Sequence, residues 1–400
     1  MPFSPPYGIV AGIQEMELAA TSWGTMDENR SNRIASLDGL RGIACLSVLL
    51  LHIGMMIRPL GADSPYGLIP GTASVLIFFV LSGVVLSIAP LARLRAGAHD
   101  DWLGYYPRRV VRLGIPAAAA IALGIIAGFV AWRMGQMSRS AMAVEFSSGA
   151  RRAVHDILMQ FDLLFNVSDD TVNLFGGAIS RVDSPVWSMS WELWFSLTLP
   201  LAIACIGRIR RDGPAVLGAL AAIFLSSWSG YFPLRLCLMF WIGTLLARRW
   251  ERLRALRLPR ALEVISLIAA ALLIELPQLV ATGPLGAAAL STAMSAACAA
   301  CVALAMTDGL LHRALSCKPI LMLGALSYSL YLTHAITIGA IEALLPRIGI
   351  ASPLMLSGIA LAASLGVATA FWRLIERPSI RLSHVVGRAT HPSRGGVDVI

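Results

Sequence analysis

Ten apolar runs constrain the fold of this chain more than any other feature. A helix needs about 20 apolar residues to cross a bilayer, and backbone groups in lipid are satisfied only within helices or closed barrels. Of the 400 residues, 57% are hydrophobic and only 14% are charged, which excludes an ordinary soluble protein. We therefore predict an all-α integral membrane protein with about ten transmembrane helices in one bundle. The runs lie at about 40–59, 71–92, 113–132, 191–207, 214–229, 232–247, 261–280, 286–308, 320–345 and 352–375.

Basic residues are distributed unevenly among the short loops. On one side these loops carry only Arg58 and Arg347. The other side carries sixteen basic residues: Arg93, Arg95, Arg108, Arg109, Arg112, Arg208, Arg210, Arg211, Arg248, Arg249, Arg252, Arg254, Arg257, Arg260, Arg313 and Lys318. The positive-inside rule assigns this second side, with both termini, to the cytoplasm of a multi-pass protein in the plasma (bacterial inner) membrane. Cations divided in this way argue against a nucleic-acid partner, which needs them on one solvated face.

The segments outside the bundle are short, apart from one. Residues 1–32 are expected to be a disordered cytoplasmic tail, 33–380 the transmembrane domain, and 381–400 a second cytoplasmic tail. Residues 1–32 lack the basic start and apolar core of a signal peptide, and Met26 is an alternative start that intact-mass measurement would reveal. The outer loop at about 133–190 holds an apolar patch at 157–165, predicted to lie on or dip into the membrane. It serves either as a lid or binding surface, or as a simple packing loop.

The first apolar run contains two ionisable residues, Arg41 and His52. Eleven residues make three helical turns plus roughly 20°, so both side chains lie on one helix face, about 16 Å apart along the axis. An ionisable group inside a membrane is costly and is a functional-site hypothesis. His52 either bonds a neighbouring helix or acts as a base, because a neutral imidazole can take a proton from a hydroxyl nucleophile.

Further candidates lie near the ends of other runs. Arg41 alone is either a positive-inside anchor or part of a site. Arg108, Arg109 and Arg112 meet the membrane on the same side as Arg41, and together the four could bind a phosphorylated ligand. Glu192, among three tryptophans at the outer start of the fourth span, is either an interfacial anchor or a placed acid or base. His334 is expected in the outer half of the ninth span, either as a core histidine or as part of a site.

Other signals point to structure rather than chemistry. The Glu376-Arg377-Pro378 run predicts a helix stop with a local ion pair. The six cysteines lie in or beside apolar runs without a framework spacing, and a structural role is expected for them. Motifs of metalloproteases, phosphate-binding loops and paired-cysteine metal sites do not occur in the sequence, so no metal is predicted.

Six motifs, in order, resemble the acyltransferase-3 family of integral membrane O-acyltransferases. They span almost the whole chain, and their order is more specific than the spacing of Arg41 and His52 alone. The motifs are SLDGLRG with His52 eleven residues after its arginine, FFVLSG (Phe78 to Gly83), PRRVVRLGIP (Pro107 to Pro116), VWSMSWELWF (Val186 to Phe195), LGALSYSLYLTHA (Leu323 to Ala335) and ERP (Glu376 to Pro378).

The resemblance implies transfer of an acyl group, usually acetyl, from cytoplasmic acyl-CoA to a hydroxyl of a carbohydrate or lipid-linked glycan at the outer side. Acyl-CoA would dock on Arg41, Arg108, Arg109 and Arg112. His52 would act as general base or carry the acyl group itself, with Glu192 and His334 near the acceptor. The alternative is a proton-coupled transporter or flippase, in which His52 and Glu192 relay protons without acyl chemistry. The sequence leaves the acceptor, the acyl chain and the oligomeric state open.

Overall fold

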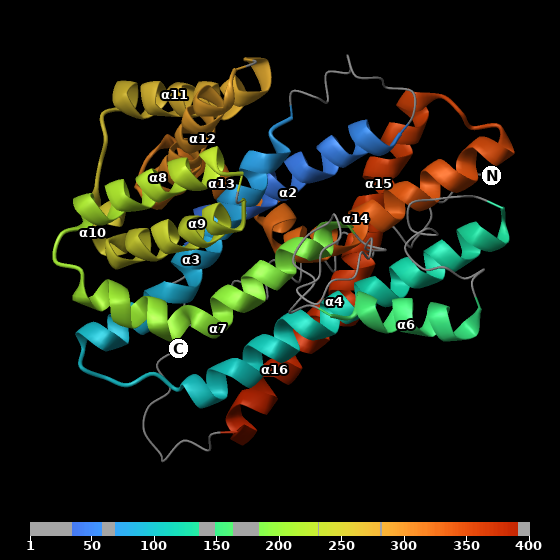
Figure 1. Cartoon of the computed structure of the whole chain (residues 1–400), viewed down its shortest axis with the longest axis horizontal. Coiled ribbons are helices and arrows are strands. Elements are labelled where there is room, and N and C mark those ends of the chain that lie inside the picture. The colour runs from blue at the N-terminus through green and yellow to red at the C-terminus, as the bar shows by residue number, and fades with distance from the viewer. Residues whose placement is uncertain are drawn as a thin grey trace, which may run out of the picture. The chain divides into compact units, whose positions relative to one another are not determined.

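All ten predicted apolar runs are helices in the computed structural model, which describes residues 34–57, 69–135, 149–162, 184–230, 232–280 and 282–390. The described residues from 35 to 390 belong to one compact unit. Within the described residues the fold is all-α (Figure 1). The ten helices are α2 (Ala35–Met56), α3 (Gly71–Arg95), α4 (Trp102–Arg133), α7 (Trp187–Arg208), α8 (Asp212–Trp228), α9 (Phe232–Arg248), α11 (Arg260–Leu279), α12 (Pro284–Met306), α14 (Lys318–Leu344) and α15 (Pro353–Phe371).

Seven described helices are long and apolar enough to span a bilayer, so this is a multi-pass integral membrane protein. They begin at Ala35, Gly71, Trp102, Trp187, Pro284, Lys318 and Pro353. The shorter elements are α6 (Ala150–Gln160), α10 (Trp250–Ala255), α13 (Leu310–Leu315), α16 (Arg377–Thr390), two 3-10 turns (Ser184–Val186 and Leu345–Ile348) and a π-helical turn (Trp372–Glu376). The predictions for residues 1–32, for Arg58, for the outer loop at 136–148 and 163–183, and for 391–400 lie outside the described residues.

Helix ends that carry arginines gather on one face, as the alternating topology predicts. The last turns of α3 and α9 meet where Arg95 donates to the carbonyl oxygen of Arg248. Arg248 donates in turn to the carbonyl oxygen of Ile206, in the last turn of α7, and to Asp212, the first residue of α8, both at 3.2 Å. We call this side of the bundle, which carries Arg95, Arg248, Ile206 and Asp212, the arginine-rich face.

The parallel pair of α2 and α14 forms the centre of the bundle. Three contacts between these helices share one offset of 282 positions: Gly42 with Gly324, the Cys45 thiol with the Ser327 carbonyl oxygen, and His52 with His334. A Cβ atom on Gly42 would lie 2.6 Å from the backbone nitrogen of Gly324, so the two backbones touch. Small residues therefore bring the helices close and fix their register.

The core around this pair extends from α2 and α14 to α15. Its buried side chains come from both central helices, and Leu356 and Ala360 of α15 close it on one side. A second core joins α4, α7 and α14 through Leu113, Met189 and Leu332, and Ile157 of α6 packs against it. The apolar patch predicted in the outer loop therefore begins, at Ile157, as part of a helix that packs on the bundle.

The helix that contains the third apolar run begins about three turns before that run. Helix α4 begins at Trp102 instead of residue 113, because the Asp101 side chain accepts from the backbone N–H of Gly104 at 2.8 Å and caps the helix. The arginines that looked like loop residues therefore lie within the first three turns of α4.

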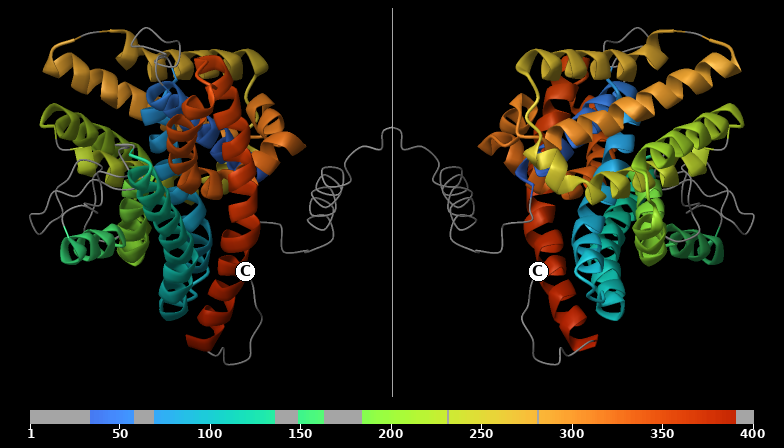
Figure 2. Two further views of the ribbon diagram at one scale, coloured as in Figure 1. Left: turned by 90° about the vertical axis from the view of Figure 1, so that its right-hand side faces the viewer. Right: turned by 90° about the vertical axis from the view of Figure 1, so that its left-hand side faces the viewer.

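The helix stop predicted at Pro378 is wrong. Figure 2 shows α15, the π-helical turn and α16 as one continuous red helix, with α4 packed along its last part. Pro378 follows the π-helical turn almost directly, and this turn changes the local hydrogen-bond partners, so the helix continues past a residue that has no N–H. The chain from 377 to 390 is thus a helix against α4 rather than the start of a disordered tail.

Candidate active site

His52 of α2 and His334 of α14 face each other across the central helix pair. His52 Nδ1 lies 3.2 Å from His334 Nε2, and the ring centroids are 4.9 Å apart. His334 is only 1% exposed and His52 is half-buried. The structure thus joins two of the predicted site residues directly.

The neighbours of the two rings determine where their protons lie. His334 Nδ1 is 3.0 Å from the carbonyl oxygen of Leu330, which can only accept, so this nitrogen carries the proton and Nε2 of the neutral ring is an acceptor. His52 Nδ1 lies between that acceptor and the carbonyl oxygen of Val48 at 2.9 Å, so it also carries its proton. In neutral His52 the basic lone pair is therefore on Nε2.

A hydroxyl pair connects the histidines to the start of α7. Tyr331, one turn before His334, has its hydroxyl 2.9 Å from Ser188 Oγ, and the two rings of Tyr331 and His334 are 5.9 Å apart. Because Ser188 Oγ donates to the carbonyl oxygen of Pro185, Tyr331 is the donor to Ser188. Phe78 packs edge-on against Tyr331 at 5.6 Å and restricts its ring.

Arg109 of α4 and Glu192 of α7 form an ion pair. Arg109 Nη2 lies 2.8 Å from Glu192 Oε1, with 11% and 24% of the two side chains exposed. Arg109 Nε donates to Ser196 Oγ at 3.1 Å, and that hydroxyl donates to the Glu192 carbonyl oxygen. This buried arginine therefore has its partners within the protein.

A second carboxylate, Glu376 of the π-helical turn, lies beside α14. Ser329 Oγ donates to Glu376 Oε2 at 2.5 Å, and Glu376 is 8% exposed. Arg112 and Arg41 lie within electrostatic range of it. The local ion pair predicted between Glu376 and its neighbouring arginine is absent among the described contacts, which instead link Glu376 to α14.

Arg41, Arg108 and Arg112 are accessible, unlike Arg109. The side chain of Arg41 is 29% exposed and 3.7 Å from Asp38, and that of Arg108 is 38% exposed and 3.7 Å from Asp101. Arg112 is exposed and has Arg41 and Arg109 within electrostatic range. These guanidinium groups can therefore receive an anion from outside the protein.

The position of Glu192 differs from the sequence-based expectation. We predicted that it would lie at the outer start of its span, near His334, with Arg109 on the opposite side. However, Ser188, the second residue of α7, contacts Tyr331, which is the fourteenth residue of α14, so α7 begins beside the middle of α14. Glu192 follows one turn later and meets Arg109 instead of His334.

Sequence reasoning missed the roles of four polar residues. Ser196 accepts from Arg109 and Ser329 donates to Glu376, whereas Ser188 and Tyr331 bond each other and join α7 to α14 one turn before His334. All four stand within or next to the motifs quoted above, and that proximity is the only signal that could have singled them out.

The histidine pair is suited to proton transfer, and the exposed arginines near it are suited to binding an anion. His52 presents a basic nitrogen in a position fixed by His334, and the exposed arginines lie toward the starts of α2 and α4. Ser329 and His334 are five residues apart on α14, or about 7.5 Å along the axis, so the charged groups and the histidines belong to one region of the bundle.

Comparison with known proteins agrees with this description. A family described as "Acyltransferase domain", the acyltransferase 3 family, matches residues 34–373. No curated protein and no solved structure gave a match. The matched segment contains His52, Glu192, His334 and the four arginines, whereas Glu376 and α16 follow it. The chain therefore belongs to the acyltransferase 3 family of membrane acyltransferases.

Proposed function

We propose that this acyltransferase moves an acyl group, expected to be acetyl, from acyl-CoA to a hydroxyl of a carbohydrate or lipid-linked glycan. The observation that carries the proposal is the contact between His52 Nδ1 and His334 Nε2, because it leaves the lone pair of His52 on Nε2. A base is what an acceptor hydroxyl needs in order to attack a thioester.

In the proposed reaction, Nε2 of His52 takes the proton of the acceptor hydroxyl as its oxygen attacks the thioester carbonyl carbon. The new C–O bond forms, the C–S bond breaks, and the sulfur leaves as the thiolate of CoA. The proton held by His52 then returns to the thiolate, so His52 ends the cycle neutral. His334 accepts a hydrogen bond from Nδ1–H and stabilises the imidazolium formed in between.

The phosphates of the donor are assigned to Arg41, Arg108 and Arg112. These three side chains are accessible, and a phosphate bound among their guanidinium groups would receive charge-assisted hydrogen bonds. Arg109 was predicted to bind the donor as well, but its contacts favour a different role: it holds Glu192 and thereby the start of α7. Glu192 is proposed to position this region rather than to transfer protons.

The orientation of the reaction across the membrane follows from the charge distribution. If the arginine-rich face is cytoplasmic, α2 and α14 both run outward from it, and the donor arginine Arg41 lies about 16 Å nearer to the cytoplasm than His52. Acyl-CoA would then enter from the cytoplasm and the acceptor from the outer side.

The test is transfer of labelled acetyl from acetyl-CoA by the purified protein in detergent, with membrane glycans as acceptor. The proposal predicts release of free CoA together with label in a glycan ester that mild base removes. Label transfer from a longer acyl-CoA alone would correct the donor. No CoA release with any acyl-CoA, combined with proton-coupled uptake in vesicles, would overturn the proposal in favour of a transporter.

A further inference from the structure

A basic cavity of about 310 Å³ opens at the arginine-rich face, in addition to the candidate active site. Its lining comes from the last turns of α3 and α9 and from α10, and consists of Arg95, Arg248, Arg249, Glu251 and Arg252. None of these residues takes part in the proposed acyl transfer. The volume corresponds to about ten water molecules at ~30 Å³ each, which is enough for a phosphodiester with a glycerol group.

The charges around this cavity are not balanced. Four guanidinium groups line it together with the single carboxylate of Glu251, which lies 3.9 Å from Arg95. Behind the lining, the carboxylate of Asp212 contacts both Arg248 and Arg249. Four positive charges against these two negative charges leave an excess of two, and an anion in the cavity would reduce their mutual repulsion.

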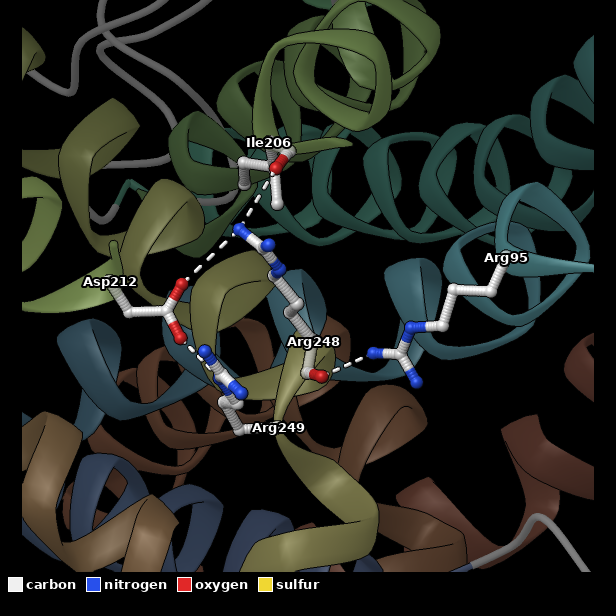
Figure 3. A network of polar contacts seen from close by, with 5 residues as sticks. All are labelled: Arg95, Ile206, Asp212, Arg248 and Arg249. Carbon is white, nitrogen blue, oxygen red and sulfur yellow. Dashed lines mark hydrogen bonds and ion pairs between the residues drawn. The ribbon is translucent and has the colours of Figure 1, made fainter. Parts of the chain in front are cut away.

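Three of the four guanidinium groups, those of Arg95, Arg248 and Arg249, have protein partners before any ligand arrives. Figure 3 shows Asp212 between Arg248 and Arg249, with Arg95 reaching the carbonyl oxygen of Arg248. Arg248 also donates to the carbonyl oxygen of Ile206. Side chains fixed in this way lose little conformational entropy when they bind an anion.

The surroundings point to a lipid rather than to a soluble ligand. The cavity lies at the end of α3, one of the helices long and apolar enough to span a membrane, and basic pockets between helices in such positions bind anionic headgroups. Leu94, directly before Arg95, is 45% exposed, and Leu201 on α7 is 66% exposed. Leu94 adjoins the lining residue Arg95 and Leu201 is an exposed residue of the neighbouring helix α7, so both suit contact with lipid acyl chains.

We propose that this cavity binds the phosphate headgroup of an anionic phospholipid. The headgroup phosphate contacts the arginines, and the acyl chains lie along the exposed apolar residues of the neighbouring helices. Binding joins the ends of α3 and α9, and through Arg248 also the end of α7, and therefore raises the thermal stability of the bundle.

The test compares phosphatidylglycerol with phosphatidylcholine, each added to the delipidated full-length protein in detergent, by thermal denaturation and by native mass spectrometry. We expect phosphatidylglycerol to raise the melting temperature and to remain bound, and phosphatidylcholine to do neither. Arg252→Gln and Arg249→Gln should each weaken phosphatidylglycerol binding about tenfold, the effect of losing one charged hydrogen bond. The matched control is Arg254→Gln, because Arg254 is on the same short helix but stacks on the Trp250 ring, 5.6 Å from its centroid.

Three outcomes would overturn the proposal. Equal effects of the two lipids would show that the cavity does not select a charged headgroup. Unchanged phosphatidylglycerol binding in Arg252→Gln and Arg249→Gln would place the lipid elsewhere. Inorganic phosphate or ADP producing the full thermal shift would assign the cavity to a soluble phosphate compound. Arg252→Gln leaves the contacts of Asp212 intact, so it remains informative if Arg249→Gln does not fold.

Discussion

His334 Nε2 lies 3.2 Å from Nδ1 of His52, a histidine on a different helix, and together with the Val48 carbonyl oxygen it favours the His52 tautomer that carries its proton on Nδ1. The two residues are 282 positions apart, the same offset that relates Gly42 to Gly324. The close packing of two small residues near one end of the helix pair therefore sets the alignment of two polar ones further along it. The register of α2 against α14 and the position of His52 relative to His334 therefore depend on the same contact between the two helices.

Replacement of His334 should reduce turnover without removing the base. His334→Ala removes one of the two acceptors near His52 Nδ1–H and leaves the carbonyl oxygen of Val48 as the other. The imidazolium of His52 then loses the support of His334, and we expect kcat to fall about 100-fold, at the lower end of the range for general acid–base catalysis. His334→Gln keeps an acceptor oxygen, so it should recover part of this loss. Steady-state kinetics with labelled acetyl-CoA measures both variants. Equal activity of His334→Ala and wild type would show that the pairing has no role in turnover.

The contact between α2 and α14 should tolerate no added methyl group. In Gly324→Ala the new Cβ would lie 2.2 Å from the carbonyl oxygen of Asp38, so the helices must separate. We expect a loss of about 1–3 kcal/mol in the free energy of unfolding together with lower activity, because His52 moves relative to His334. Gly358→Ala is the matched control on α15, since a Cβ there has nothing within 4 Å. Unfolding in mixed detergent micelles measures both; similar values for the two variants would contradict the close packing.

The ion pair between Arg109 and Glu192 should show strong energetic coupling. Arg109→Gln or Glu192→Gln alone leaves one largely buried charge without its partner, and we expect each to cost about 2–3 kcal/mol of stability. The double variant should recover much of that loss. A double-mutant cycle of unfolding free energies gives the coupling, and additive losses would mean that the pair does not interact in solution.

Arg112→Gln should weaken binding of acyl-CoA and leave the rate of acyl transfer nearly unchanged. Loss of one charged contact to a phosphate predicts a KM for acyl-CoA that rises about tenfold, with kcat changed little. Arg133→Gln, at the other end of α4, is the control and should leave KM unchanged. A fall in kcat at constant KM for Arg112→Gln would move this residue from donor binding to the reaction itself.

The sequence predicted the helices well and their lateral contacts poorly. The ten apolar runs are visible because crossing a bilayer requires about 20 apolar residues, whatever the neighbouring helices are. The start of α4 could not be predicted because Asp101, which caps the helix, is followed by a segment rich in arginine that has the composition of a loop. The helix after Pro378 was hidden because a π-helical turn, which no residue pattern announced, lets the helix continue past a proline.

Within the candidate site, the residues were predictable but not their pairing. His52 and His334 stood out because ionisable groups are costly within apolar runs. Nothing in the spacing of Arg109 and Glu192 indicated that they touch, since that contact depends on α7 starting beside the middle of α14. Glu376 was assigned to a local ion pair because its partner Ser329 lies 47 positions earlier in the chain.

The most direct test of the account is the rate of acyl transfer by His52→Ala, compared with wild type and with His99→Ala, an exposed histidine outside the site. Acyl-CoA binding is measured on the same preparations. The account predicts that His52→Ala binds acyl-CoA with unchanged affinity but transfers acyl groups at least 100-fold more slowly, whereas His99→Ala behaves as wild type. Transfer by His52→Ala at the wild-type rate would show that His52 is not the base and would contradict the proposed mechanism.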